Sequence, residues 1–165
     1  LYRLVGSEMC IRDRHKKCAK WLRDIKLWAM EMSWCGQVLY SGTAKGTVLR
    51  LEAPISFWGG ISPDNAEVVL ENHPQRGVKI TDKILIVPDP IGSSSSAAIL
   101  LELLYAKIAP KGLILGTNKD AILPISVLVA EQMGWNTIPI IAMENPTFKS
   151  GEELEIKTDG TIHSI

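Results

Sequence analysis

Four consecutive serines, Ser93 to Ser96, follow Gly92 in the stretch "IGSSSSAAILLEL". Serine hydroxyls can serve as bases or nucleophiles when a neighbouring group stabilises their charged form, and they can hydrogen-bond a carboxylate. The residues from Ala97 to Lys107 are helix formers without Gly or Pro, which argues against a flexible Gly/Ser linker. One serine is enough to cap the start of this helix. The surplus hydroxyls at a positively polarised helix start predict a site for an anionic ligand.

The serine run lies between a strand and a helix in the predicted fold. Residues 84–87 form a short apolar, β-branched run, which is typical of a buried strand. Further strands are expected at 36–40, 46–51, 67–70, 112–115 and 139–142, a second helix at 122–133, and a closing hairpin at 153–162. Pro124 fits the first turn of that second helix, and Gly134 fits its stop. The pattern predicts an α/β domain with a curled, barrel-like mixed sheet and flanking helices.

A second unusual stretch is "SFWGG", in which two aromatic residues precede two glycines at 56–60. Adjacent glycines allow backbone conformations and close approaches that a side chain forbids. The stretch is either a turn whose rings pack into the core or a loop that walls a small-molecule pocket.

Composition excludes several classes of protein. The chain has 165 residues, 46% hydrophobic and 22% charged, with a formal net charge of zero, so it is globular and no nucleic-acid partner is expected. No apolar stretch approaches the roughly 18 residues that span a bilayer, so no membrane partner is expected. Cys10, Cys18 and Cys35 lack CxxC spacing, so neither a zinc site nor a disulfide framework is expected, and a cytoplasmic setting fits best.

The first residues need separate treatment. Residues 1–14 resemble translated adapter sequence and are excluded from the fold. Residues 15–33 fit either an amphipathic helix or a stretch upstream of a start at Met30 or Met32. The domain itself is expected over residues 34–165.

Several segments match one known family in order. These are "LRLEAPISFWGG" at 49–60, "NHPQRG" at 72–77, the strand at 84–87, "IGSSSSAAILLEL" at 91–103, "APKGLIL" at 109–115, "DAIL" at 120–123 and "PII" at 139–141. The chain resembles the small subunit, or swivel domain, of aconitase X-type dehydratases. The resemblance implies a swivelling β/β/α fold and a hydro-lyase that dehydrates a small hydroxy acid. It also implies a large catalytic subunit that carries an iron–sulfur cluster, so this chain is expected to bind no cofactor itself and to be inactive alone.

The resemblance also implies roles for individual residues. Ser93, the first serine after the glycine, corresponds to the family's catalytic serine and is expected to act as the general base. Substrate contacts are expected from Gly92, Ser94, Ser95, Ser56, Phe57, Trp58, Gly59, Gly60, His73 and Asp120. Two of these have a simpler interpretation, since Asp120 fits a helix N-cap and His73 fits an exposed turn.

The family includes bacterial members that act on cis-3-hydroxy-L-proline and archaeal members that act on mevalonate 5-phosphate. Archaeal members have basic residues just before the Gly-Ser pair, where this chain has Asp89-Pro90-Ile91. A phosphate would lose a cationic partner there, which favours cis-3-hydroxy-L-proline. Mevalonate 5-phosphate dehydration and a non-catalytic, partner-binding swivel module remain as alternatives. The chain has no P-loop or dinucleotide loop, which argues against a free-standing enzyme.

Overall fold

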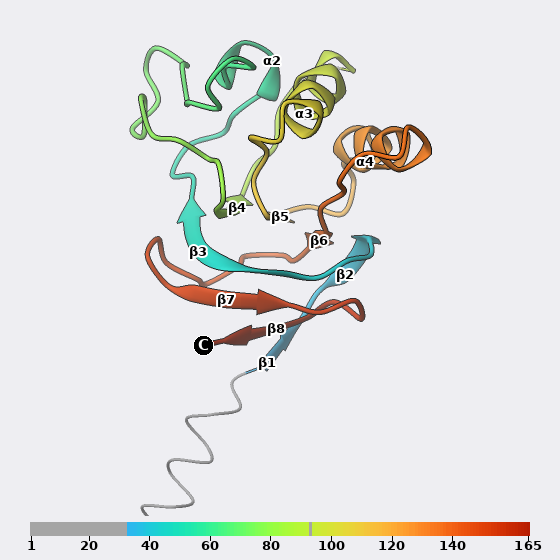
Figure 1. Ribbon diagram of the computed structural model, residues 1–165. Coiled ribbons are helices and arrows are strands. Elements are labelled where there is room, and N and C mark those ends of the chain that lie inside the picture. The colour runs from blue at the N-terminus through green and yellow to red at the C-terminus, as the bar shows by residue number, and fades with distance from the viewer. Residues whose placement is uncertain (1–32, 93) are drawn as a thin grey trace, which may run out of the picture. The chain divides into compact units, whose positions relative to one another are not determined.

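A computed structural model describes residues 33–92 and 94–165. The predicted adapter-like segment at 1–14 lies outside these residues, and so does the helix or leader predicted at 15–33 except for Ser33, which begins β1. Within the described part of the chain, eight strands form one mixed sheet in the order β1-β8-β7-β3-β4-β5-β6-β2 (Figure 1). The strands are β1 Ser33–Cys35, β2 Gln37–Tyr40, β3 Ala44–Arg50, β4 Ile84–Val87, β5 Gly112–Leu115, β6 Ile140–Ala142, β7 Glu153–Ile156 and β8 Thr161–Ser164. The helices are α2 Phe57–Gly60, α3 Ser95–Tyr105 and α4 Ile122–Gln132.

The sheet curls because two stretches of chain belong to both of its halves. The start of β3 pairs antiparallel with β7, and its end pairs parallel with β4. Only Gly36 separates β1, which pairs with β8, from β2, which pairs with β6. The Gly36 N–H donates to the Gly160 carbonyl at 3.1 Å. A Cβ on Gly36 would lie 2.8 Å from the Ala142 carbonyl oxygen, so this corner needs a glycine. The sheet therefore closes on itself, which confirms the predicted barrel-like form.

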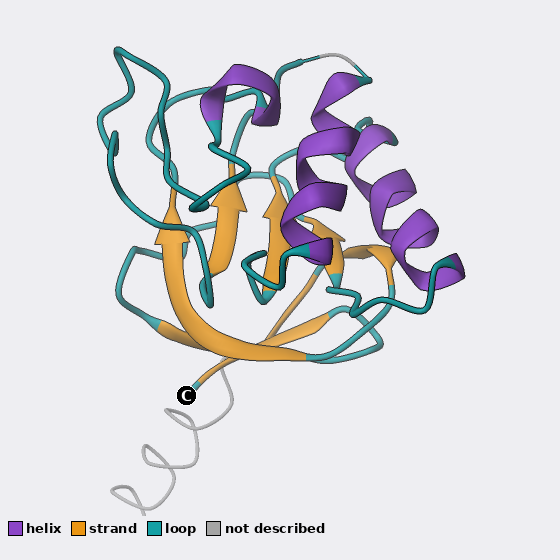
Figure 2. Ribbon diagram, turned by 45° about the horizontal axis from the view of Figure 1, so that its top comes forward, coloured by secondary structure: helices purple, strands orange, loops and turns teal. Residues whose placement is uncertain are grey.

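Three layers result, in the order sheet, sheet and helices. Residues of the inner strands β4, β5 and β6 alternate between two apolar cores. Ile84 and Ile86 face the core between the two halves of the sheet, whereas Leu85 and Val87 face the helices. Both faces of β4 are covered, which is why its sequence is an unbroken apolar run. Figure 2 shows α3 and α4 on one face of these strands, and Figure 1 shows β7, β8 and β1 on the other. The predicted β/β/α architecture is confirmed.

Both long helices follow their sequence patterns. Helix α3 buries residues at helical spacing, namely Ile99, Leu100, Leu103 and Leu104. Helix α4 has Pro124 in its first turn, where an N–H would lack an intrahelical partner in any case. Gly134 follows α4 with a φ of +71°, and its N–H donates to the Glu131 carbonyl at 2.9 Å. A left-handed residue at this place is a common helix stop, as predicted.

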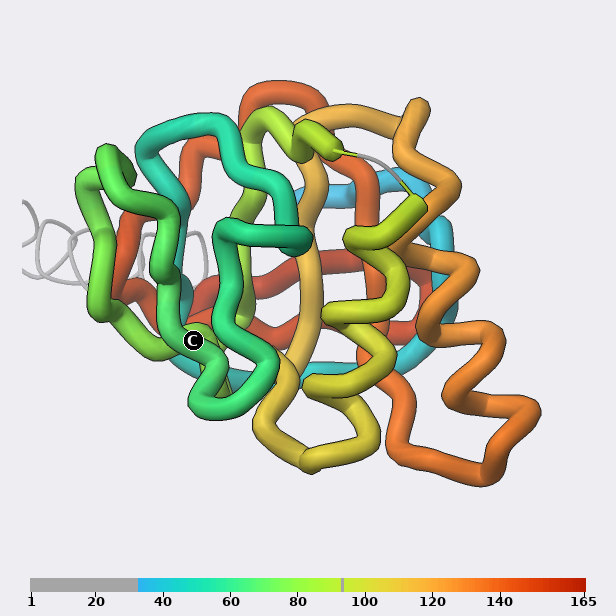
Figure 3. Tube along the Cα trace, turned by 90° about the horizontal axis from the view of Figure 1, so that it is seen from above, coloured from blue at the N-terminus to red at the C-terminus, as the bar shows by residue number. Residues whose placement is uncertain are grey.

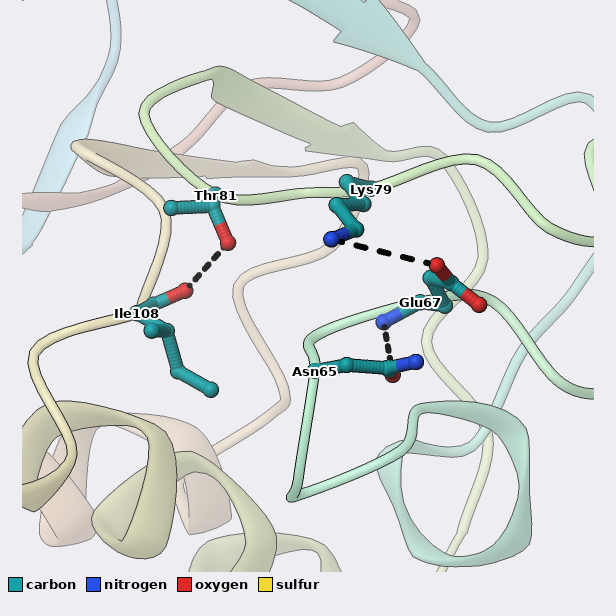
Figure 4. Close-up of polar contacts among 5 residues, drawn as sticks. All are labelled: Asn65, Glu67, Lys79, Thr81 and Ile108. Atoms are coloured by element: carbon teal, nitrogen blue, oxygen red, sulfur yellow. Dashed lines mark hydrogen bonds and ion pairs between the residues drawn. The ribbon is translucent and has the colours of Figure 1, made fainter.

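The predicted strand at 67–70 is wrong. Residues 61–80 form an irregular excursion with isolated bridges between Ile61 and Val68 and between Glu67 and Lys79. No continuous ladder forms, because the neighbouring residues Glu67 and Val68 pair with two different segments. Polar contacts hold the excursion (Figure 4): Lys79 Nζ lies 4.0 Å from the Glu67 carboxylate, and the Glu67 N–H donates to Asn65 Oδ1 at 3.2 Å. The neighbouring Thr81 hydroxyl donates to the Ile108 carbonyl at 2.9 Å, which ties this end of the excursion to the chain after α3.

None of the described helices is both long enough and apolar enough to cross a membrane.

Candidate active site at the carboxyl ends of the parallel strands

A hollow of about 440 Å³ opens where β3, β4 and β5 end. These three strands run parallel, and the chain leaves β4 toward α3 and β5 toward α4 at one edge of the sheet (Figure 3). The lining comes from the three segments after the strands and from the starts of α2, α3 and α4: Ile55, Phe57, Asp89, Pro90, Ile91, Gly92, Ser96, Thr117, Lys119, Asp120, Ala121, Ile122 and Leu123. Ligands of α/β proteins commonly bind outside the carboxyl ends of parallel strands. The hollow is therefore the candidate site.

The two unusual stretches of the sequence meet in this hollow. Ser56 Oγ and Ser96 Oγ lie 3.2 Å apart and share a hydrogen bond. Gly92 packs against both, since a Cβ at this position would lie 2.5 Å from Ser56 Oγ and 2.7 Å from Ser96 Oγ. The φ of Gly92 is +139°, a conformation that favours glycine. The Ile91 N–H donates to the Ile55 carbonyl at 3.0 Å, which fixes the two segments side by side.

The serines of the run have different surroundings. Ser93, the predicted general base, lies outside the described residues. Ser96 is 6% exposed and lines the hollow, whereas Ser94 is exposed and Ser95, the first residue of α3, is half-buried. Ser94 occupies the N-cap but makes no side-chain cap hydrogen bond, because its backbone is already helical at φ −51° and ψ −23°. A side-chain cap requires an extended N-cap residue. The capping expected of the serine run is therefore not provided by Ser94.

The "SFWGG" stretch splits into a buried and an exposed part. Phe57 is 2% exposed and lines the hollow, whereas Trp58 is 60% exposed and is not part of the lining. Trp58 has a ψ of 117° and Gly59 a φ of +76°, so the short helix α2 is kinked at these two residues. Gly60 approaches Ile55 closely, since a Cβ there would lie 2.7 Å from its side chain. Core packing and pocket lining, the two interpretations of the sequence, are thus combined in Phe57.

Asp120 lines the hollow and caps α4 at the same time. Its Oδ1 accepts hydrogen bonds from the N–H groups of Ile122 at 2.8 Å and Leu123 at 3.3 Å. The simpler interpretation of Asp120 as an N-cap is confirmed, and its place in the lining leaves the second role open to test.

His73 is not in the lining of the hollow, and the expectation of an exposed turn is wrong, since the side chain is 5% exposed. Its Nδ1 accepts a hydrogen bond from the Gln75 N–H at 3.1 Å, so the ring hydrogen lies on Nε2, which faces the Ala53 carbonyl at 3.3 Å. The ring thereby holds the backbone at Ala53, two residues before Ile55, in place.

Comparison with known proteins identifies the family of this chain and its fold. The family model described as "Aconitase X swivel domain" matches residues 33–164. The chain belongs to the aconitase X swivel-domain family. The swivel domain is similar to the crystal structure of Thermococcus kodakaraensis aconitase X in its holo-form, with a TM-score of 0.73, 24% identity, and coverage of 82% of this chain and 99% of that one. This likeness confirms the predicted fold.

Two groups of curated relatives resemble the swivel domain. It is 35% identical over 69% of its length to a cis-3-hydroxy-L-proline dehydratase of Hypocrea jecorina, and 34% identical over 65% to one of Pseudomonas aeruginosa. The chain spans only 19% and 18% of these two relatives. It is also 26% identical over 75% of its length to the phosphomevalonate dehydratase small subunit of Thermococcus sibiricus, of which it covers 91%. Both groups are named dehydratases, so the swivel domain belongs to a family of hydro-lyases.

Sequence reasoning missed two polar residues of the hollow. Lys119 and Thr117 lie on the loop after β5 and line the hollow, and the Lys119 N–H donates to Thr117 Oγ1 at 3.2 Å. The signal was available, because Lys119 directly precedes Asp120 after a predicted strand. The carboxyl ends of neighbouring parallel strands meet at one edge, so this loop had to lie beside the serine run.

The described residues do not fit an iron–sulfur cluster. Such clusters are held by several cysteine thiolates, and Cys35 is the free cysteine of the described part of the swivel domain, exposed at the end of β1. No group of three or more His, Cys, Asp or Glu side chains that could hold a metal occurs in residues 33–92 and 94–165.

Proposed function

We propose that the swivel domain is the small part of a hydro-lyase that dehydrates cis-3-hydroxy-L-proline together with a large catalytic subunit. The observation that supports this best is the hollow at the ends of three parallel strands, which Gly92 and Ser96 line and where Ser96 is hydrogen-bonded to Ser56 behind the lining. The hollow opens to the surface of the swivel domain, which is consistent with a second protein surface that completes it. The chain spans about a fifth of its hydroxyproline dehydratase relatives, which is consistent with a large remaining catalytic part.

Dehydration of a β-hydroxy acid removes a proton from the carbon beside the carboxylate and expels the hydroxyl group. The proton requires a base within about 3 Å. We assign this role to Ser93 because of the family resemblance and because its chain neighbour Gly92 lines the hollow. The start of α3 would stabilise a negative charge by only ~1 kcal/mol, which is too little to form an alkoxide at neutral pH. Further positive charge must come from the partner, so the swivel domain alone should be inactive.

Any iron–sulfur cluster belongs, in this proposal, to the large subunit. The described residues of the swivel domain do not provide a set of ligands for one. This chain's contribution is to supply the serine, to shape the wall of the hollow and to orient the substrate within it.

The second candidate substrate is mevalonate 5-phosphate. It is favoured by the phosphomevalonate dehydratase small subunits, one of which is covered to 91% by the match with this chain. Against it, the hollow is lined by the carboxylates of Asp89 and Asp120 and by one ammonium group, Lys119. A phosphate and a carboxylate on one ligand would meet more negative than positive charge there. The imino acid, which has one charge of each sign, fits this lining better.

Reconstitution tests the proposal. The swivel domain and its large subunit would be combined without oxygen, and turnover of cis-3-hydroxy-L-proline and mevalonate 5-phosphate measured side by side. We expect turnover of the imino acid, with a loss of at least ~10²-fold in Ser93→Ala. Ser164→Ala, on β8 and away from the hollow, is the matched control and should keep full activity.

Full activity of Ser93→Ala would exclude the serine as the base. Turnover of mevalonate 5-phosphate alone would assign the second substrate. A tight complex that turns over neither would favour a non-catalytic module.

A further inference from the structure

Two exposed side chains of opposite charge line the hollow from neighbouring loops. Asp89 follows β4, and Lys119 follows β5. Neither takes part in an ion pair within the described residues, where Lys79 and Glu67 form the ion pair that is present. The two charges are therefore available to a ligand.

The third charged group of the lining is already engaged. Both hydrogen bonds of Asp120 go to backbone N–H groups at the start of α4. Its carboxylate thus balances the positive end of that helix. Asp89 and Lys119 are therefore the charged groups of the lining whose side chains form no ion pair and no such cap within the described residues, while Asp120 still adds its negative charge.

The two loops begin side by side and are held in place. Val87, the last residue of β4, pairs with Leu115, the last residue of β5, and the Gly116 N–H donates to the Val87 carbonyl at 2.9 Å. Next to Lys119, Asn118 Nδ2 donates to Gln37 Oε1 at 3.2 Å. On the other loop, Ile91 is bonded to Ile55. Backbones fixed in this way reduce the ordering cost when a ligand binds.

We propose that Asp89 and Lys119 determine specificity by recognising the two charges of a cyclic zwitterion. Asp89 accepts hydrogen bonds from the ring ammonium, and Lys119 binds the carboxylate. This inference rests on the proposed function, since it concerns the substrate of the same site. Charge-assisted hydrogen bonds are stronger than neutral ones, so each partner discriminates against an analogue that lacks the matching charge.

The test compares two ligands that differ in one group. cis-3-Hydroxy-L-proline has the ring nitrogen, and cis-2-hydroxycyclopentane-1-carboxylate has the same ring size, hydroxyl and carboxylate without it. The carbocycle would be measured as a substrate or, where it is not turned over, as a competitive inhibitor. In the reconstituted dehydratase, Asp89→Asn should raise KM for the imino acid at least ~10-fold and leave binding of the carbocycle within about twofold. Lys119→Met should weaken both ligands by similar factors, and Lys119→Arg should restore most of the loss.

Each variant has a control at the opposite end of the same strand. Asp82 precedes β4 and Lys111 precedes β5, and both are exposed. Asp82→Asn and Lys111→Met should leave both ligands unaffected. An equal effect of Asp89→Asn on both ligands, or no effect on either, would overturn the inference while the dehydratase activity stands. Failure of the unaltered complex to act on the imino acid would instead reject the proposed function.

Discussion

Ser56 and Ser96 are 40 positions apart in the sequence, and their hydroxyl oxygens lie 3.2 Å apart beside the hollow that Ser96 lines. The pair joins the segment after β3 to the first turn of α3. Gly92 lies against both hydroxyls at a distance that no other residue could keep. The two motifs that suggested a site from the sequence are thus one packed unit, and its integrity can be tested.

The hydrogen bond between the two serines should appear as a coupling in a double-mutant cycle. Ser56→Ala and Ser96→Ala should each lower the free energy of unfolding by about 0.5–1.5 kcal/mol, because each leaves a partly or fully buried hydroxyl without its partner. The double variant should lose less than the sum of the two. Urea denaturation of all four proteins measures this, and strictly additive losses would show that the bond contributes nothing.

Gly92→Ala should distort the site beyond the cost of backbone strain alone. Its φ of +139° disfavours any side chain, and the added Cβ would also overlap both serine hydroxyls. Gly77→Ala is the matched control, because Gly77 has a φ of +84° with no atom within 4 Å of the added Cβ. We expect a larger loss of unfolding free energy for Gly92→Ala than the ~1–2 kcal/mol of strain expected for the control. Equal losses of unfolding free energy would mean that the two serine side chains move away from the added Cβ without destabilising the domain.

Phe57 and Trp58 should respond to truncation in opposite ways. Phe57→Ala removes a ring that is 2% exposed and should cost about 3–5 kcal/mol in unfolding free energy. Trp58→Ala removes a ring that is 60% exposed and should change it by less than about 0.5 kcal/mol. Thermal unfolding of the isolated domain checks both. A large destabilisation by Trp58→Ala would show that its ring packs against the domain.

Asp120 combines a structural role with a place in the hollow, and two substitutions separate these roles. Asp120→Ala loses both cap hydrogen bonds and should lower the free energy of unfolding by about 0.5–2 kcal/mol. Asp120→Asn keeps an oxygen acceptor and should retain most of the stability. If the Asn variant is stable but its KM for the substrate rises, the carboxylate also contacts the ligand; an unchanged KM limits Asp120 to capping.

The turn between β7 and β8 should respond to acid through Asp159. Hydrogen bonding from Thr161, chiefly from its backbone N–H at 2.9 Å, lowers the pKa of Asp159 from its ordinary value of 3.8. Since the folded pKa lies below the unfolded one, the stabilisation is complete above the unfolded pKa and is lost as the pH falls through the folded pKa. The stability difference between wild type and Asp159→Ala should therefore be constant near neutral pH and shrink below about pH 4. Asp159→Asn keeps an acceptor without a charge, and its own hydrogen bond should not titrate. A difference that stays constant down to pH 2 would contradict the assignment.

Much of the fold could be predicted from the sequence because its signals are local. The apolar runs at 84–87 and 112–115 became the inner strands β4 and β5, and helical spacing located α3 and α4 to within a few residues. The excursion at 61–80 was mispredicted because a strand needs one partner along its length, whereas Glu67 and Val68 pair with two different segments. No local sequence pattern predicts which segments these two residues pair with.

The sequence by itself determined the inner strands, the two long helices, their order and the presence of a serine-rich helix start after a buried strand. The tertiary structure decided which described serine lines the hollow, since only the fold brings Ser96 beside Ser56 and the loops after β4 and β5. It also shows that Lys119 lines the hollow and that His73 does not. The physical reason is that periodicity and propensity act over a few neighbouring residues. The lining of the hollow depends instead on three loops brought together by strand pairing, and only the closed sheet fixes their positions.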